Sequence, residues 1–350
     1  MKPGDEILLA LGGGSARGIA HIGVIRALEA AGYRIAGVAG TSIGAVVGGV
    51  YCAGVMDAYE EFMIAIDRLG VLRMLDPVLP RSGLFAGMRL AELMRSFVGD
   101  VKIEDLSVPF RAVAVDVSGG DEVRIRSGEL VAAMRASYGI PGLFTPFALD
   151  LPDGADLAGP KRRHWLVDGG VASPVPVTAA RDLGVLPIVA VNVNRSFPVP
   201  SIVEKSASTE PSPSRRERLA SFLDGDLVPR AAREFLRGFL DSSPEEADSA
   251  KPADSRASFL LRWLGMFSSG DKSQRRPGMI DSLYNSVVLL QHHLAQAQFL
   301  VAPPALLIEP NMEGVGLFDY QLGKALVEEG RRATEAALGV LTGSATEAGS

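Results

Sequence analysis

Cysteine, aromatic residues and histidine are scarce in this chain of 350 residues. There is one cysteine, Cys52, so an intramolecular disulfide is excluded and a reducing compartment is expected. Aromatic residues make up only 6%, whereas 39 residues are glycine and 47% are hydrophobic. This composition favours α/β packing with tight strand-to-helix turns around one large core.

An excess of positive charge is also missing. The formal net charge is -6 and the sequence pI is about 5.4. Binding to nucleic acid phosphates relies on concentrated Lys and Arg, so nucleic acid is not expected as the main partner.

Long hydrophobic runs are few, and the two that stand out are both interpreted as core elements. The apolar run 7–11 is too short for the hydrophobic region of a signal peptide, so no signal peptide is expected. The uncharged stretch 35–56 is long enough to span a bilayer. It contains six glycines and a Gly-flanked turn, so we interpret it as a buried strand followed by a helix.

The turn in that stretch reads Gly40-Thr-Ser42-Ile-Gly44. Apolar residues lead into it and small apolar residues follow, a pattern typical of strand, abrupt turn and helix. In a nucleophile elbow, the serine Oγ stands at the tip of such a turn, above the N-terminus of the helix. Gly40 and Gly44 suit this turn because the strand and helix backbones approach closely there. The pattern therefore predicts Ser42 as a nucleophile.

A glycine-rich loop, residues 12–18, follows the predicted strand 7–11 and reads Gly-Gly-Gly-Ser-Ala-Arg-Gly. It lacks the Lys-Ser/Thr pair that a P-loop needs after Gly18, and a dinucleotide fingerprint starting at Gly12 meets Arg17 in its last place. A right-handed β-α-β crossover would place this loop and the serine turn at the same sheet edge.

Backbone amides of this loop have two interpretations. Beside an elbow serine, the amides around Gly13, Gly14 and Ser15 suit an oxyanion hole for a tetrahedral acyl intermediate. Alternatively, the loop is a turn that only permits close packing.

A base for Ser42 is the next requirement. The order Ser42, Asp168, then His292 or His293 matches an α/β-hydrolase triad. In that fold, however, the elbow follows several strands, whereas here it follows the second, and the paired histidines lie within a Gln-rich helical pattern. His21 and His164 are read as structural or solvated residues.

A carboxylate can replace histidine if it contacts Oγ and is partly desolvated, because desolvation raises its pKa. Asp168 follows the short predicted strand 165–167 and precedes two glycines. We expect that strand to end at the same sheet edge as the elbow, which makes Asp168 the best candidate. Asp116, at another strand end, is the alternative.

Composition divides the chain into four parts. Residues 1–194 alternate strands and helices, and 195–277 form a Ser/Pro-rich insertion with two amphipathic pieces. That insertion is expected to act as a lid, a dimer contact or a membrane-surface contact, or else as a solvated linker. Residues 278–341 resume the core, and 342–350 are expected to be a disordered tail. The Pro/Gly segment 138–146 is either the lining of an acyl pocket or a connector.

Three motifs in this order, the glycine-rich loop, the serine turn and Asp168-Gly169-Gly170, resemble the patatin-like phospholipases, specifically their short bacterial branch. The similarity also takes in residues 20–28, 135–144, 171–177 and 318–320. It covers about 7–194 and 279–338 and leaves the insertion unmatched. Two departures are Ser15, where the branch often has a fourth glycine, and Tyr138.

The resemblance implies a three-layer α/β/α sandwich with a mostly parallel central sheet. It also implies a Ser-Asp dyad acyl hydrolase in which Ser42 attacks the ester carbonyl and Asp168 takes the proton. Amides of Gly13, Gly14 and Ser15 would then stabilise the oxyanion. Arg17 would brace the loop or contact a lipid phosphate. The remaining motif glycines are Gly12, Gly18, Gly40, Gly44, Gly169 and Gly170.

The resemblance implies no metal and no cofactor. The implied substrates are fatty-acyl esters of phospholipids or lysophospholipids, and the expected location is cytoplasmic with peripheral membrane contact. A homo-oligomer is left open. Two other functions remain: an acyltransferase that uses the same serine, and a non-catalytic lipid-binding or regulatory protein.

Overall fold

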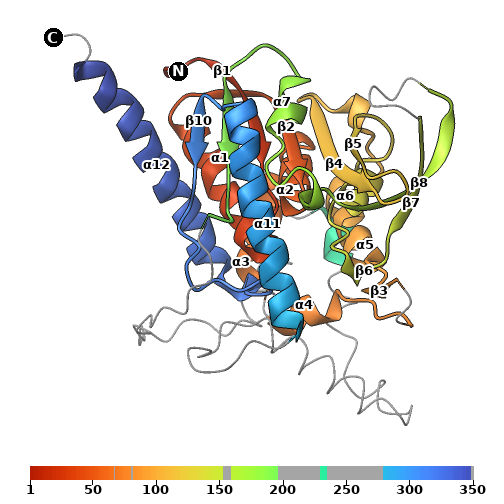
Figure 1. Cartoon of the computed structure of the whole chain (residues 1–350). Coiled ribbons are helices and arrows are strands. Elements are labelled where there is room, and N and C mark those ends of the chain that lie inside the picture. Colours follow the sequence, from red (N-terminus) through yellow and green to blue (C-terminus); the bar gives the residue numbers. More distant parts are fainter. Residues whose placement is uncertain (67, 80–81, 153–158, 196–228, 235–278, 348–350) are drawn as a thin grey trace, which may run out of the picture.

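The central feature of the computed structural model is a mixed β-sheet (Figure 1). The structure describes residues 1–66, 68–79, 82–152, 159–195, 229–234 and 279–347. Within these residues, eight strands form the sheet in the order β10-β9-β1-β2-β4-β8-β7, and β5 also pairs with β4. Their bounds are β1 (Glu6–Leu11), β2 (Arg34–Thr41), β4 (Phe110–Asp116), β5 (Asp121–Ile125), β7 (Phe147–Pro152), β8 (Lys161–Asp168), β9 (Ile188–Val191) and β10 (Leu306–Ile308).

Strand direction divides the sheet into two parts. Strands β10, β9, β1, β2 and β4 are mutually parallel, whereas β5 and β8 run antiparallel to β4 and β7 runs antiparallel to β8. A separate pair of short parallel strands is formed by β3 (Gly83–Phe85) and β6 (Gly142–Phe144).

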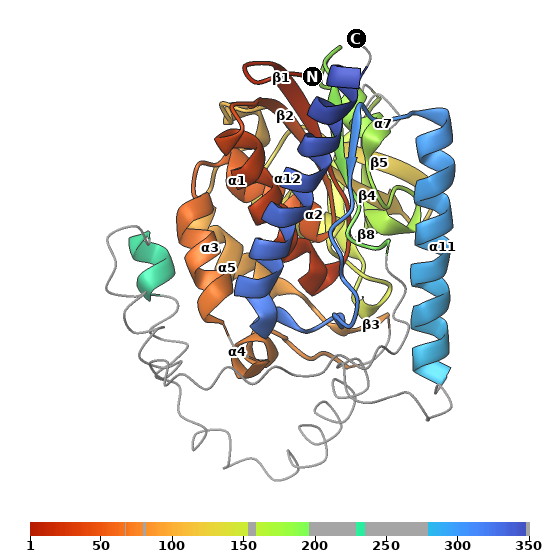
Figure 2. The same cartoon turned by 90° about the vertical axis from the view of Figure 1, so that its left-hand side faces the viewer.

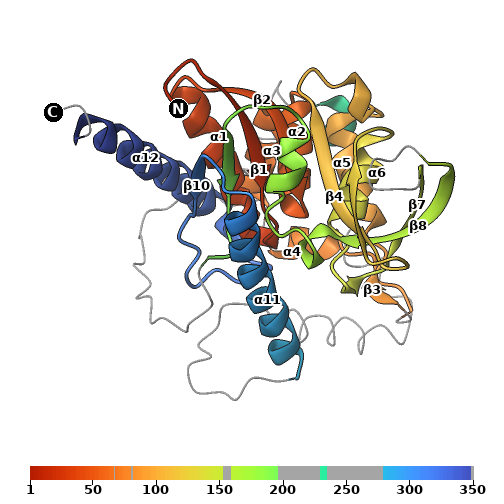
Figure 3. The ribbon, with the colours of Figure 1, turned by 45° about the horizontal axis from the view of Figure 1, so that its top comes forward.

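Helices cover both faces of the sheet, as Figures 2 and 3 show. One layer contains α1 (Ala20–Ala30), α2 (Ile43–Cys52), α3 (Met56–Ala65), α5 (Met88–Val98), α6 (Leu130–Ser137) and α12 (Gly323–Glu347), with the short α4 (Arg68–Arg73) beside it. The other layer contains α7 (Val177–Arg181) and the long α11 (Met279–Val301). Short 3-10 turns are η1 (Ser15–Ile19), η2 (Ile103–Asp105), η3 (Gly169–Val171) and η5 (Tyr320–Leu322). The predicted three-layer α/β/α sandwich is confirmed.

Side chains of β1 show why two helical layers are needed. Ile7, Leu9 and Leu11 belong to the large core under α1 and α2, whereas Leu8 and Ala10 belong to a smaller core under α7 and α11. Successive strand residues point to opposite faces, so a strand that is apolar at every position must be covered on both sides.

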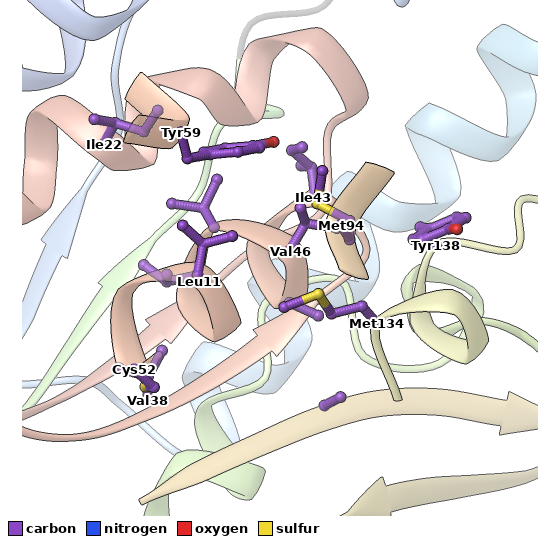
Figure 4. Close-up of a cluster of buried hydrophobic side chains, with 14 of the residues drawn as sticks. Leu11, Ile22, Val38, Ile43, Val46, Cys52, Tyr59, Met94, Met134 and Tyr138 are labelled. Atoms are coloured by element: carbon purple, nitrogen blue, oxygen red, sulfur yellow. The ribbon is translucent and has the colours of Figure 1, made fainter. Parts of the chain in front are cut away.

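The uncharged stretch 35–56 accounts for β2 and α2, as the sequence predicted. Helix α2 is buried along its length, and Val46 and Val47 pack in the large core with Leu11 and Met134 (Figure 4). Among the helices in the described part of the chain, none is both long and apolar enough to cross a membrane.

The structure differs from the sequence analysis in several elements. Strand β8 has eight residues where the sequence analysis expected three, 165–167, and it runs antiparallel to β4. Its partner β7 was not predicted, because its residues are mostly half-exposed and show no alternation. Helix α12 is assigned through Glu347, beyond the predicted end near residue 341. The predicted insertion, 195–277, lies outside the described residues except for Arg195 and 229–234.

Candidate active site

Ser42 occupies a strained backbone conformation between β2 and α2. Its φ and ψ are 57° and -124°, values of the first central position of a type II′ turn, where glycine is usual. A Cβ at Gly40 would lie 2.4 Å from the Gly44 carbonyl oxygen, and one at Gly44 would lie 2.2 Å from the Leu11 carbonyl oxygen. The flanking glycines are therefore required by close backbone contact, as the elbow pattern predicted.

The Ser42 side chain is paired with a buried carboxylate. Its hydroxyl donates a hydrogen bond to Asp168 Oδ2 at 2.5 Å, and both residues are 5% exposed. The other oxygen, Oδ1, accepts from the Gly170 amide at 2.7 Å. Burial raises the pKa of Asp168 to about 6, and the hydrogen bonds from Ser42 and Gly170 act in the opposite direction. In this position the carboxylate can accept the hydroxyl proton directly.

Strand β4 is the template that brings the two residues together. Thr41 pairs with Val113, and Asp168 pairs with the next residue, Ala114. The strand that precedes Asp168 was expected to end at the sheet edge where the elbow lies, and β8 does end there, although it runs antiparallel to β4. A Cβ at Gly169 would lie 2.3 Å from the Val113 carbonyl oxygen, so only glycine fits after the carboxylate.

The glycine-rich loop lies directly beside the serine. A Cβ at Gly13 would approach the Ser42 Cβ to 3.2 Å. The Gly13 amide, however, donates to the Pro174 carbonyl at 2.9 Å, so it is already used and is not a free oxyanion donor. Among the hydrogen bonds of the described residues, the amides of Gly14 and Ser15 have no acceptor. Ser15 also has a positive φ, 50°, which costs energy and is frequent at functional sites.

The outer glycines of the loop are fixed by contacts with neighbouring elements. The Gly12 amide donates to the Val191 carbonyl at 3.0 Å, and a Cβ at Gly12 would lie 2.8 Å from that same oxygen. A Cβ at Gly18 would lie 2.1 Å from the side chain of Ile43. The loop is thus held between β9 and the first residue of α2.

Arg17 stabilises the glycine-rich loop through hydrogen bonds of its buried side chain. It is 2% exposed, and its guanidinium donates to the Val315 carbonyl at 2.9 Å and to Asn194 Oδ1 at 3.3 Å. Asn194 in turn donates from Nδ2 to the Gly13 carbonyl at 3.0 Å. Of the two roles expected for Arg17, the bracing role fits these contacts, because the buried guanidinium is not presented to a lipid phosphate.

Comparison with known proteins identifies the family. Residues 9–181 match the model of the patatin-like phospholipase family. The chain belongs to the patatin-like phospholipase family.

Relatives of this patatin-like chain occur in bacteria and animals. An uncharacterized NTE family protein of Mycobacterium tuberculosis is 39% identical over 191 residues, which cover 55% of this chain and 50% of the relative. Neuropathy target esterase of Drosophila melanogaster is 32% identical over 54% of this chain and 13% of its own length. Patatin-like phospholipase domain-containing protein 6 of Mus musculus is 32% identical over 54% of this chain and 14% of its own. The chain therefore spans half or less of the curated relatives it matches.

Ser137 is a contact of the patatin-like elbow that the sequence analysis did not single out. The Ser42 amide donates to Ser137 Oγ at 2.8 Å, and Ser137 Oγ donates to the Val113 carbonyl at 2.6 Å. Ser137 is fully buried at the end of α6. The sequence feature that could have indicated Ser137 is its position directly before the Pro/Gly segment 138–146.

The four histidines lie away from the Ser42–Asp168 pair and make contacts with other residues. His21 Nε2 hydrogen-bonds the Gly12 carbonyl at 2.7 Å, and burial lowers the His21 pKa to about 4, so its neutral ring donates. His164 Nδ1 bonds Asp116 Oδ2 at 2.9 Å. His292 and His293 lie on α11 with their rings 5.6 Å apart. Within the described residues, no histidine hydrogen-bonds Ser42 or Asp168.

Asp116, the alternative base, forms hydrogen bonds with Ser118, Arg162 and His164. Its carboxylate accepts from the Ser118 amide and from Arg162 as well as contacting His164. The hydrogen bond of the Ser42 hydroxyl goes to Asp168 and not to this carboxylate.

The Pro/Gly segment is packed as a connector. Tyr138, Leu143 and Phe144 are buried, and the Tyr138 hydroxyl donates to the Gly87 carbonyl at 2.8 Å. Buried Arg135 donates to the carbonyl oxygens of Ala86 and Thr145, so the segment is fixed from both ends.

Proposed function

We propose that this chain is a lipid acyl hydrolase that cleaves fatty-acyl esters through Ser42 and Asp168. The observation that carries the proposal is the 2.5 Å hydrogen bond between the Ser42 hydroxyl and the buried Asp168 carboxylate. Membership of the patatin-like phospholipase family, whose relatives include a protein named as an esterase, supports lipid esters as the substrate class.

In the acylation step, Ser42 Oγ attacks the ester carbonyl carbon while its proton moves to Asp168 Oδ2. The carbonyl oxygen becomes an oxyanion, for which the Gly14 and Ser15 amides are the proposed donors. Collapse of the tetrahedral intermediate breaks the bond to the leaving alcohol, which takes the proton from Asp168. In deacylation, water gives a proton to Asp168 and attacks the acyl-enzyme, and Ser42 regains its proton as the fatty acid leaves.

The environment of Asp168 suits this role. A pKa of about 6 leaves the group ionised near pH 7 but more basic than an ordinary aspartate. The Gly170 amide binds Oδ1 and so leaves Oδ2 directed at the hydroxyl. One positioned general base of this kind typically contributes about 10²- to 10⁴-fold to the rate.

The remaining parts of the proposal concern substrate and organisation. We propose phospholipids or lysophospholipids as substrates, met at a membrane surface by a cytoplasmic protein. Residues 1–194 and 278–341 would form the catalytic domain, because Arg17 in the first part donates to the Val315 carbonyl in the second.

The test is labelling with a fluorophosphonate probe, followed by a lipid panel. Wild type should be labelled, Ser42→Ala should not, and Asp168→Asn should react at least about 100-fold more slowly. Ser118→Ala, which removes an exposed serine outside the site, is the matched control and should label normally.

The panel should contain phospholipids and lysophospholipids, with and without glycerol or a lysolipid as acceptor, and products should be followed by mass spectrometry. Free fatty acid that depends on Ser42 supports the hydrolase. Acyl transfer to the acceptor in preference to water would favour the acyltransferase, and bilayer binding without turnover or labelling would favour a non-catalytic lipid-binding protein.

A further inference from the structure

The C-terminal segment 315–320 contacts consecutive residues of the glycine-rich loop. Ser15 Oγ and the Tyr320 hydroxyl share a hydrogen bond of 3.0 Å, and the Ala16 amide donates to the Leu317 carbonyl at 3.2 Å. The next residue of the loop also donates to a carbonyl of this segment, as described above. Tyr320 follows Ser15 by 305 residues in the chain, so the second half of the loop is attached to the C-terminal part of the sequence.

The segment 315–320 is itself held in place by a buried carboxylate. Asp319 is fully buried, and its Oδ2 accepts from the Gly316 amide at 2.8 Å while its Oδ1 accepts from Gln321 Nε2 at 2.9 Å. The next residue, Tyr320, is half-buried and packs against the large core. The Tyr320 hydroxyl therefore meets the loop from a fixed position.

Ser15 is the loop residue that this hydroxyl contacts, and its backbone is strained. Among the described residues other than glycine, only Ser15 and Ser42 have a positive φ. Glycine adopts such a conformation freely, whereas a residue with a Cβ is strained in it and persists there only when its surroundings hold it. The hydrogen bond to Tyr320 is a contact that only the serine side chain can make, and it opposes relaxation of the strain.

The direction of the Ser15 amide depends on this contact. Rotation about the N–Cα bond of Ser15 turns the amide relative to the side chain. Tyr320 fixes the side chain, and the hydrogen bond from Ala16 to the Leu317 carbonyl fixes the chain that follows. With both held, the Ser15 amide is kept in one orientation.

We propose that Tyr320 is a positioning residue that acts through Ser15 Oγ to keep the Ser15 amide aligned as an oxyanion donor. The proposal rests on the proposed function, in which the Gly14 and Ser15 amides stabilise the oxyanion. Such donors are effective because they are oriented before the charge develops, so misalignment lowers the rate more than it weakens substrate binding. Burial raises the pKa of Tyr320, so its hydroxyl stays protonated near neutral pH and the hydrogen bond is kept.

The first measurement is steady-state kinetics with a soluble short-acyl ester. Tyr320→Phe deletes one oxygen and keeps the ring, and it should lower kcat about 10-fold while KM changes by less than about twofold. Ser15→Ala deletes the other oxygen and should lower kcat by a similar factor. Tyr51→Phe is the matched control: the Tyr51 hydroxyl donates to Glu29 at 2.8 Å near the far end of α2 from Ser42, so kcat should be unchanged.

The double variant distinguishes one shared hydrogen bond from two independent effects. If the hydroxyls act through their common bond, Tyr320→Phe combined with Ser15→Ala should lose no more activity than either single variant. Two unrelated structural defects would instead multiply to a loss of about 100-fold. Folding is checked by circular dichroism, and either single variant carries the test if the other does not fold.

Amide hydrogen exchange tests the same contact without relying on activity. The peptide 12–18 should exchange about 10-fold faster in Tyr320→Phe and in Ser15→Ala than in wild type, and at the wild-type rate in Tyr51→Phe. Failure of the proposed function would appear separately, as wild type that neither hydrolyses the ester nor reacts with the fluorophosphonate probe. In that case, the exchange measurement alone decides whether Tyr320 holds the loop.

Three results would overturn the proposal. These are a Tyr320→Phe variant with wild-type kcat in an active enzyme, losses of kcat that multiply in the double variant, and exchange of the loop peptide that Tyr320→Phe leaves unchanged. A loss carried by KM with kcat unchanged belongs to the first of these, because it would assign Tyr320 to substrate binding instead.

Discussion

The Ser42 hydroxyl donates a hydrogen bond of 2.5 Å to the Asp168 carboxylate, and neither residue is more than 5% exposed. The carboxylate is therefore buried, and within the described part of the chain it accepts hydrogen bonds from two donors, the Ser42 hydroxyl and the Gly170 amide. Burial raises the pKa of Asp168 by more than these two hydrogen bonds lower it. The raised pKa affects both the activity and the stability of the protein.

Activity should rise with pH through the pKa of Asp168. Only the ionised carboxylate accepts the serine proton, so kcat/KM for a neutral short-acyl ester should increase about tenfold per pH unit below about pH 6 and level off above it. The measurement is a pH-rate profile between about pH 4.5 and pH 8. A profile that is flat through pH 6 contradicts the assignment of Asp168 as the base.

Asp168→Asn should make the protein more stable while it abolishes activity. In the wild type, the folded-state pKa of about 6 lies above the ordinary value of 3.8, so the unfolded state loses its proton more easily and the ionised group destabilises the fold. That cost is fully present above pH 6 and disappears as pH falls below about 4. Converted directly, it is about 3 kcal/mol, an upper limit for the gain in Asp168→Asn at pH 8.

Thermal unfolding of both proteins at pH 8 and near pH 4.5 checks this prediction. The advantage of Asp168→Asn should shrink towards the acidic end, and an equal difference at both pH values would disprove the link to ionisation.

Ser42→Gly and Ser42→Ala should differ in stability, although both should be inactive. The backbone of residue 42 has φ 57° and ψ -124°, which glycine adopts freely and alanine does not. Ser42→Gly should therefore be more stable than Ser42→Ala by about 1 to 3 kcal/mol. Chemical denaturation of the two variants gives the difference directly. Equal stabilities would mean that residue 42 stores no backbone strain.

Asn194 should act as a positioning residue for the glycine-rich loop. Its Nδ2 donates to the Gly13 carbonyl and its Oδ1 accepts from Arg17. Asn194→Ala removes both contacts and should lower kcat by about 10- to 100-fold with a much smaller change in KM, because the loop amides lose their alignment. Steady-state kinetics with one soluble ester separates the two parameters.

Asn194→Asp separates the two contacts, since it keeps an acceptor for Arg17 but loses the donor to Gly13. Loss of kcat in both variants indicates that the Gly13 contact matters. If only Asn194→Ala is impaired, the contribution comes through Arg17, and a loss of stability with kcat unchanged in both variants would leave Asn194 a purely structural role.

The elbow and the glycine-rich loop were predictable because their signals are local. Gly40 and Gly44 report a turn that is closed by backbone contact, and the loop follows the neighbouring parallel strand β1. Asp168 was selected because its strand was expected to end beside the elbow, and β8 does so, but its antiparallel direction was not predicted. The direction of β8 depends on the hairpin with β7, whose half-exposed residues show no periodicity in the sequence.

Contacts through side-chain amides and hydroxyls were not visible in the sequence at all. Asn194 contacts the site from the turn after β9 and Ser137 from the end of α6, and no spacing rule relates them to Gly13 or Ser42. The same holds for the Gly13 amide, whose acceptor at Pro174 lies more than 150 residues away along the chain. Such partners depend on how elements pack, and a pattern within one element does not record that.

Thr41 and Asp168 pair with consecutive residues of β4. During synthesis of the chain, the serine turn is therefore made before the strand that carries its proton acceptor. A ribosome completes the serine turn early, but the hydroxyl has no proton acceptor until Asp168, 126 residues later, has emerged and β8 has paired with β4. The growing polypeptide thus carries an inert serine for much of its synthesis. Reactivity at that serine therefore reports that β8 has paired with β4.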